Sequence, residues 1–129
     1  MSDAPVVLDA SALLALLNAE PGADRVMAAL PRAVVGAVNL SEVVAKLAEF
    51  GLPPDEVAAA VDGLGLQVVP FDAPDAYRAG LLRPTTRAAG LSLGDRACLA
   101  LGASLGGTVL TTDRRWLELG LPVTVQMIR

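Results

Sequence analysis

The stretch PVVLDASALLALL, residues 5–17, sets the pattern that decides the fold. It begins with a short apolar run of β-type residues, 5–8, which ends in Asp9. The apolar residues from about Ser11 to Leu17 then indicate a helix. A buried strand followed at once by a helix is the repeating unit of an α/β fold. In such folds ligands bind beyond the carboxyl ends of the strands, which is where Asp9 is expected to lie.

The alternation of strand and helix continues to the end of the chain. Further strands are expected at 33–38, 66–69, 108–110 and 123–126. Further helices are expected at about 21–30, 40–51, 53–61, 74–82, 93–105 and 113–119. Continuous apolar strands separated by helices are typical of a parallel sheet that helices cover on both faces. The sequence therefore predicts an α/β fold, a three-layer α/β/α sandwich with a mainly parallel central sheet, as a single domain over residues 1–129.

The composition excludes several kinds of enzyme site. Hydrophobic residues make up 53% of the 129 residues and charged residues 19%, which suits a globular domain with a large core. The chain contains no histidine and one cysteine, Cys98. It therefore cannot build a Ser-His-Asp triad, a Cys-His pair, an internal disulfide or the usual tetrahedral zinc site. Polar chemistry must come from carboxylates, hydroxyls, arginines or a bound cofactor, and carboxylates favour hard cations such as Mg²⁺ or Mn²⁺.

No segment of the sequence predicts a membrane span or a secretory signal. The longest uncharged stretch, 97–112, has 16 residues and three glycines, below the roughly 18 apolar residues expected of a spanning helix. The N-terminal residues include Asp3 and no basic cluster. We therefore expect a cytoplasmic protein.

The charge of the chain is divided unevenly between its two parts. Residues 1–77 hold 11 acids and three bases, whereas residues 78–129 hold three acids and seven arginines, so net charges of −8 and +4 add to the total of −4. Such asymmetry indicates an anionic partner, and arginine suits bidentate contacts with phosphate. A solvated charged surface would show the same asymmetry.

Four acids fall at or just beyond the predicted carboxyl ends of strands, or at the start of a helix that follows. Asp9 ends the first strand, and Glu42 lies in the first turn after the second. Asp95 begins a long helix, and Asp113 follows the fourth strand. Four converging carboxylates would repel one another and destabilise the fold unless a cation were bound. Their placement therefore predicts a metal site.

Three of these acids also have a purely structural interpretation. Asp9 and Asp113 can each cap the helix that follows. Asp95 at a helix start complements the helix dipole. Asp95 shares a helical face with Cys98 and Leu99, however, and an acid on an apolar face needs a partner.

Glu42 has the strongest structural alternative. Asn39 and Glu42 have the spacing of a capping box at the N-terminus of a helix. Glu42 and Lys46 also have the i, i+4 spacing of a favourable ion pair. These two interactions would account for Glu42 without a metal.

Four segments that contain these acids resemble the conserved blocks of a known family. They are VVLDAS at 6–11, NLSEV at 39–43, LSLGDRA at 91–97 and LTTDRRW at 110–116. In order, spacing and total length they are similar to PIN-domain ribonucleases, and most similar to the VapC-type toxins of VapBC toxin-antitoxin systems. The resemblance covers essentially the whole chain.

The resemblance implies a PIN fold and a Mg²⁺-dependent endoribonuclease, with Mn²⁺ as an alternative ion. The acidic quartet that it implies consists of Asp9, Glu42, Asp95 and Asp113. Thr111 and Ser11 would be supporting hydroxyls. We expect Asp9, Asp95 and Asp113 to be metal ligands, the first two by direct contact, and Glu42 to act directly or through water. A metal ion can activate water and neutralise the phosphate, so no histidine base is required.

The resemblance also implies partners. A VapB-type antitoxin would lay a segment across the acidic site and block it, since an acidic pocket attracts basic side chains. Family members commonly form homodimers, and the substrate would be RNA. Arg96, Arg114 and Arg115 lie beside two members of the quartet and are expected to hold RNA phosphates, although surface ion pairs would explain them equally well.

Two other functions fit the same coarse layout. A catalytically silent PIN-like module could bind RNA or a protein partner, but this chain does not show the usual mark of such a module, the loss of a quartet acid. A phospho-acceptor receiver domain also carries acids at strand ends, but it uses a lysine after a late strand, where this chain has only arginine. Retention of all four acids favours the nuclease.

Overall fold

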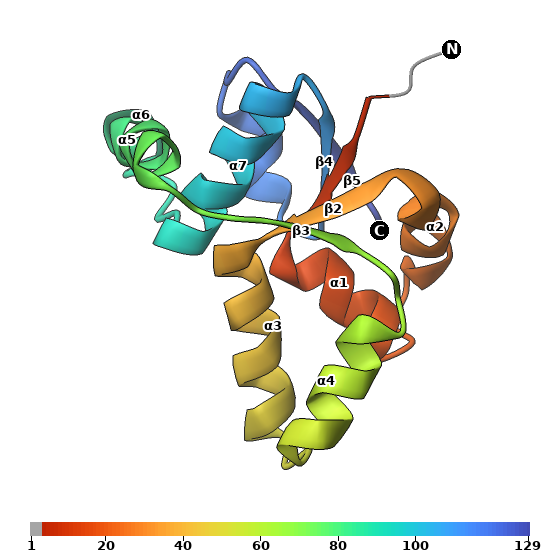
Figure 1. Ribbon diagram of the computed structural model, residues 1–129. Coiled ribbons are helices and arrows are strands. Elements are labelled where there is room, and N and C mark those ends of the chain that lie inside the picture. The colour runs from red at the N-terminus through yellow and green to blue at the C-terminus, as the bar shows by residue number, and fades with distance from the viewer. Residues whose placement is uncertain (1–3) are drawn as a thin grey trace.

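The computed structural model describes residues 4–129 and confirms the three-layer α/β/α architecture (Figure 1). Within these residues the chain forms one sheet of five strands in the order β3-β2-β1-β4-β5. Every neighbouring pair of strands is parallel, so the described sheet is wholly rather than mainly parallel. The strands are β1 (Val6–Leu8), β2 (Ala33–Gly36), β3 (Gln67–Val69), β4 (Thr108–Thr111) and β5 (Thr124–Met127).

Each predicted helix is present between or after these strands. The α-helices are α1 (Ala10–Leu17), α2 (Ala23–Ala29), α3 (Ala37–Glu49), α4 (Pro54–Asp62), α5 (Ala73–Leu81), α6 (Arg83–Thr86) and α7 (Leu93–Leu105). The 3₁₀ helices are η1 (Leu30–Arg32) and η2 (Arg114–Glu118), the second in place of the short helix expected at 113–119. The sequence pattern does not predict η1 or α6, because three and four residues are too few to show a period. No helix within residues 4–129 combines the length and the apolar composition needed to cross a bilayer.

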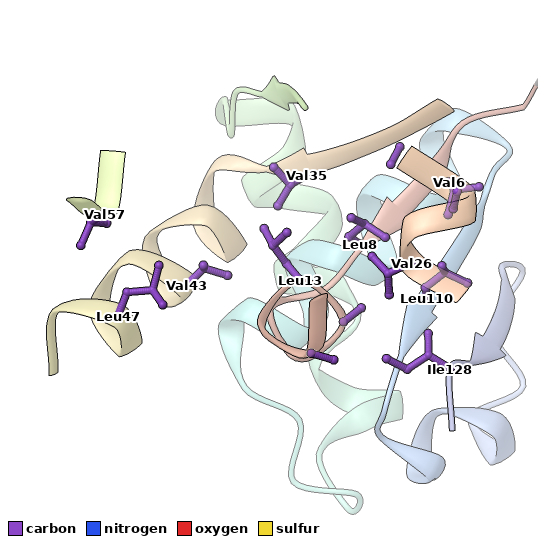
Figure 2. Close-up of a cluster of buried hydrophobic side chains, with 14 residues drawn as sticks. Val6, Leu8, Leu13, Val26, Val35, Val43, Leu47, Val57, Leu110 and Ile128 are labelled. Atoms are coloured by element: carbon purple, nitrogen blue, oxygen red, sulfur yellow. The ribbon is translucent and has the colours of Figure 1, made fainter. Parts of the chain in front are cut away.

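Alternate residues of the central strand point to opposite faces of the sheet. Val6 and Leu8 of β1 face a core cluster to which α1, α2, α3 and α4 contribute (Figure 2). Val7 faces a second cluster that includes Leu99 of α7 and Trp116 of η2. Helices therefore cover both faces of the sheet at its centre, where the residues of β1, β2 and β4 are mostly buried.

The order of the strands reverses beside β1. The chain runs from β1 outward to β2 and β3, then returns to place β4 on the other side of β1 and β5 beyond it. The carboxyl ends of β1 and β4 lie together, with Leu8 paired to Leu110. Ligands of open parallel sheets bind beyond the strand ends at such a reversal. Asp9 follows β1 directly, and Asp113 comes two residues after β4. Both acids therefore lie just beyond the carboxyl ends of these two strands, where the strand order reverses.

The second strand is shorter than its apolar sequence predicts. The strand expected at 33–38 ends at Gly36, and α3 begins at Ala37. Apolar residues alone do not distinguish the end of a buried strand from the first turn of a buried helix. The buried residues of α3, which share one helical face, are Asn39, Val43 and Leu47. Asn39 therefore lies inside the helix, on its buried face, and not at its N-cap.

Leu13 of α1 tests the assignment of the core, because it is fully buried in the first cluster (Figure 2). Leu13→Ala is expected to lower the free energy of unfolding by about 2–5 kcal/mol, since it leaves a cavity. The matched control is Leu81→Ala on α5, at a position 76% exposed, which should change that free energy by less than about 0.5 kcal/mol. Denaturant titration measures both variants, and equal losses would contradict this core.

Candidate active site

A pocket of about 670 Å³ opens beside the ends of β1 and β4. The acids that line it are all four named from the sequence: Asp9, Glu42, Asp95 and Asp113. They come from the start of α1, from α3, from the start of α7 and from the turn after β4. Because these elements are far apart in the sequence, only the folded sheet brings the four carboxylates to one pocket.

Asp9 is the one buried acid among residues 4–129, with 5% of its surface exposed. Its Oδ1 accepts hydrogen bonds from the Ser11 hydroxyl at 2.7 Å and the Ala12 N–H at 2.8 Å, and its Oδ2 accepts one from the Thr111 hydroxyl at 2.5 Å. Asp9 thus caps α1 while lining the pocket. Burial raises the pKa of the Asp9 carboxyl, and these three donors offset only part of that rise.

The two hydroxyls that support Asp9 also join the ends of β1 and β4. Thr111 Oγ1 accepts a hydrogen bond from the backbone N–H of Asp113 at 3.0 Å. Ser11 Oγ accepts one from the backbone N–H of Thr112 at 3.1 Å. Each hydroxyl therefore donates to the Asp9 carboxylate and accepts from the chain beyond β4. The Thr111 hydroxyl connects two acids of the pocket directly.

Glu42 is held by Asn39 from the same helix. The Asn39 amide donates to Glu42 Oε1 at 2.9 Å and to the carbonyl oxygen of Gly94, on α7, at 3.1 Å. Gly94 lies so close that a Cβ atom there would overlap the Glu42 carboxylate. Burial raises the pKa of Glu42 against the lowering effect of the Asn39 hydrogen bond, and the charge of Asp95 raises it further.

Both structural interpretations of Glu42 are wrong. A capping box with Asn39 fails because the N-cap of α3 is Gly36, three residues earlier. The predicted ion pair with Lys46 is replaced by one in which Lys46 Nζ lies 3.6 Å from Glu49 Oε2. Glu42 is left with a neutral amide donor and a place in the pocket wall.

Asp95 lies at the N-terminus of α7, as the sequence predicts. Its Oδ2 accepts a hydrogen bond from the backbone N–H of Ser92 at 2.9 Å, and Ser92 Oγ accepts one from the backbone N–H of Asp95 at 3.2 Å. This capping box keeps the Asp95 carboxylate at the start of the helix, where it also lines the pocket. Its negative charge raises the pKa of both Asp9 and Glu42.

Asp113 differs from the other three acids because it has a cationic partner. Arg115 Nε lies 2.9 Å from Asp113 Oδ1 and 3.1 Å from Oδ2, and Arg115 Nη2 lies 2.5 Å from Oδ2. These guanidinium contacts lower the pKa of Asp113 below its usual range. Asp113 also accepts a hydrogen bond from the backbone N–H of Arg115 at 3.0 Å, so the cap that the sequence allows here is present on η2.

The structure separates the three arginines that were expected to hold RNA. Arg114 and Arg115 line the pocket. Arg96 instead points to α5, where its Nη1 donates to the carbonyl oxygen of Ala79 at 3.1 Å. Arg96 is therefore placed as a link between α7 and α5.

The pocket has the chemistry of a site for a hard divalent cation. Within residues 4–129 no lysine or arginine forms an ion pair with Asp9, Glu42 or Asp95. Carboxylate oxygens are the ligands that Mg²⁺ and Mn²⁺ prefer, and a cation would relieve the repulsion between these acids. The coordination shell is not assembled in advance, since no group of three or more acidic or cysteine side chains in this part of the chain is placed to hold an ion.

Asn39 lines the pocket and Gly94 packs against Glu42, and neither contact is predicted from the sequence. The spacing of Asn39 with Val43 and Leu47 could have predicted that Asn39 lies on the buried face of a helix. A polar side chain on such a face needs hydrogen-bond partners, and Asn39 finds them in Glu42 and Gly94. The close approach of Gly94 to Glu42 joins two distant segments, and one sequence carries no signal for that contact.

Comparisons with known proteins agree with the fold. A family model described as the PIN domain matches residues 6–121. A toxin-antitoxin complex from Klebsiella pneumoniae is similar with a TM-score of 0.77 at 17% identity, over 96% of this chain and 98% of that chain. A DNA-bound VapBC from Salmonella typhimurium is similar with a TM-score of 0.76 at 20% identity, over 98% and 99%.

A structural match with a lower TM-score also covers nearly the whole chain. VapBC-5 from Mycobacterium tuberculosis is similar with a TM-score of 0.59 at 22% identity, over 98% of this chain and 98% of that chain. No curated protein sequence matches the chain. At these identities the structural likenesses show a shared fold over nearly the full length of each protein.

Gly94→Ala is expected to push the Glu42 carboxylate away from Asn39 and into solvent without unfolding the protein. The three atoms nearest to the new Cβ all belong to the flexible end of the Glu42 side chain. The pKa of Glu42, followed by NMR titration, should fall toward its ordinary value. The matched control is Gly80→Ala on α5, where the Cβ meets open space and should add about 0.5–1 kcal/mol of helix stability. A pKa of Glu42 that stays raised in Gly94→Ala would contradict this packing.

The raised pKa of Asp9 predicts how the stability of the metal-free protein depends on pH. The native state holds the Asp9 proton more tightly than the unfolded state does. The free energy of unfolding contributed by Asp9 should therefore fall as pH rises through the native pKa, and the ionised carboxylate should cost stability at neutral pH.

Asp9→Asn removes this titration. In the presence of EDTA at neutral pH, the variant is expected to have a higher free energy of unfolding than the wild type. This difference in free energy should shrink as pH is lowered. Denaturant titration over a pH series measures it. Asp62→Asn, at an exposed acid ending α4, is the control and should not reproduce the change. A wild-type protein that gains stability from Asp9 at neutral pH would refute the prediction.

Proposed function

The chain belongs to the PIN-domain family, and on that premise we propose that it is a metal-dependent endoribonuclease that hydrolyses RNA phosphodiester bonds. The observation that carries the proposal is the single pocket lined by Asp9, Glu42, Asp95 and Asp113. The pocket lies where ligands of parallel sheets bind, beyond the strand ends at the reversal of strand order. Three of its carboxylates make no ion pair within residues 4–129, which suits a site completed by a cation.

Mg²⁺, with Mn²⁺ as an alternative, is the cofactor that this donor set suits. Asp9 and Asp95 are assigned as direct ligands, with Asp113 as a third and Glu42 acting directly or through water. When bound, the ion supplies neutralisation of the phosphate charge and a water molecule of lowered pKa. The chain has no histidine to supply that chemistry itself.

The remaining work falls to the side chains around the pocket. Ser11 and Thr111 orient the Asp9 carboxylate by donating to both of its oxygens. Asn39 fixes Glu42 through Oε1, and the second oxygen of that carboxylate is left to take or give a proton. In the metal-free pocket burial raises the pKa of Glu42.

The arginines at the pocket rim are assigned to the RNA backbone. Arg114 and Arg115 line the pocket and are exposed, and arginine suits bidentate contacts with phosphate. Aromatic residues make up 3% of the chain, which leaves few stacking platforms for bases. Selection of RNA is therefore assigned to shape and backbone contacts.

We assign this nuclease to the toxin half of a type II toxin-antitoxin pair. The support comes from the similar structures, which are VapBC and other toxin-antitoxin complexes. An antitoxin of the VapB type would cover the pocket with a basic segment, for which four carboxylates are the complementary surface. The 129 residues would act as one domain in the cytoplasm and would form a homodimer.

Cleavage of pooled total RNA tests the proposed reaction. With Mg²⁺ or Mn²⁺ the purified protein is expected to make discrete cuts that EDTA abolishes. Asp9→Asn and Asp95→Asn should each lower the rate by about 10²-fold or more, because each removes a ligand of the ion. Asp62→Asn, an exposed acid outside the pocket, should cleave like the wild type. Mapping of the cut ends identifies the substrate.

Equal cleavage by the wild type and both pocket variants would refute the assignment of the acids. A folded protein, free of antitoxin, that makes no cuts with either metal would favour a catalytically silent module that binds RNA or a protein partner.

A further inference from the structure

We propose that Arg115 is an internal counter-ion that holds Asp113 and competes with a divalent cation for it, so that the cation is fully coordinated only after the guanidinium has moved away. The proposal rests on the proposed function in one respect, that the pocket binds such a cation. It adds a regulatory contact within the chain to that site.

The first observation is that Arg115 occupies both oxygens of Asp113. Its Nε contacts Oδ1 at 2.9 Å and Oδ2 at 3.1 Å, and its Nη2 contacts Oδ2 at 2.5 Å. A forked contact of this kind combines charge-assisted hydrogen bonds to both oxygens of the carboxylate. As long as it persists, a cation that uses Asp113 as a ligand has to share that carboxylate with a positive charge.

The second observation is that the guanidinium is anchored on its far side. Arg115 Nη1 donates to the carbonyl oxygen of Ala89 at 2.5 Å, in the segment between α6 and α7. That segment leads into α7, which begins with the capping box of Ser92 and Asp95. One guanidinium therefore ties the turn after β4 to the segment that leads into α7, the helix on which Asp95 lies.

The third observation is the state of the pocket while this contact is present. Arg115 lines the pocket, close enough for the charge of Asp95 to act on it. No three acids of the described residues are placed to hold an ion in this arrangement. Arg115 thus supplies part of the positive charge that four carboxylates need, at a position where it occupies both oxygens of Asp113.

The contact is also weak enough to be exchanged. The side chains of Arg115 and Asp113 are 52% and 23% exposed, so water screens their attraction. A divalent ion carries twice the charge of a guanidinium and gains from the neighbouring carboxylates as well. Once released, Arg115 has room to turn toward the open pocket, where the phosphate of a substrate would lie.

The adjacent arginine provides a matched control. Arg114 lines the same pocket and carries the same charge, but its Nη2 donates to the main-chain oxygen of Arg129 at 3.1 Å and not to one of the four acids of the pocket. Arg114→Gln therefore reports the effect of losing one positive charge near the site. The difference between Arg115→Gln and Arg114→Gln isolates the contact with Asp113.

Isothermal titration of the full chain with MnCl₂, without RNA, tests the proposal. Arg115→Gln is expected to bind Mn²⁺ about three- to tenfold more tightly than Arg114→Gln does, because the competing guanidinium is gone. Arg115→Lys should lie between Arg115→Gln and the wild type, since lysine keeps the charge and loses the fork. In the wild type, the Nε–H resonance of Arg115 should shift when Mg²⁺ is added.

Three results would overturn the proposal. Equal or weaker binding by Arg115→Gln than by Arg114→Gln would show that Arg115 does not compete with the metal. An Nε–H resonance unmoved at saturating Mg²⁺ would show that the contact with Asp113 survives binding. Absence of Mn²⁺ binding in both the wild type and Arg115→Gln would remove the proposed function together with the counter-ion, whereas the first two results would leave the proposed function standing.

Discussion

The buried carboxylate of Asp9 is the constraint on which the rest of the site depends. An ionised acid with 5% of its surface exposed is costly unless every lone pair finds a partner. Here the partners are neutral donors, the Ser11 and Thr111 hydroxyls and the N–H of Ala12. The same hydroxyls accept from the chain after β4, so satisfying Asp9 also positions the turn that carries Asp113.

The other acids extend this constraint across the pocket. Glu42 and Asp95 face the same space from α3 and α7, and neither makes an ion pair within residues 4–129. Burial, with a smaller contribution from the charge of Asp95, raises the pKa values of Asp9 and Glu42, whereas the guanidinium of Arg115 lowers that of Asp113. Within residues 4–129, three of the four carboxylates in the pocket therefore have no cationic partner, and Asp113 has one. That imbalance is the physical reason for assigning a divalent cation to it.

Much of this arrangement is predictable from the sequence, because strand ends and helix starts are local features. The runs that end at Asp9 and precede Asp113 place both acids at the carboxyl edge of any parallel sheet. Asn39 escapes prediction because the apolar residues before it continue from strand into helix without a break. The partners of Arg96 and Arg115 escape it for another reason. A long side chain reaches atoms that only the packing of distant segments brings near, such as the carbonyl oxygens of Ala79 and Ala89.

The most direct test of this account is the stability of the protein as a function of metal concentration. If a cation completes the pocket, the free energy of unfolding of the wild type should rise with Mg²⁺ or Mn²⁺ by about 1.4 kcal/mol for each tenfold increase above the dissociation constant. Asp9→Asn should lose that dependence while remaining folded. A wild type whose stability ignores both ions, or an Asp9→Asn variant that gains as much from them as the wild type, would contradict it.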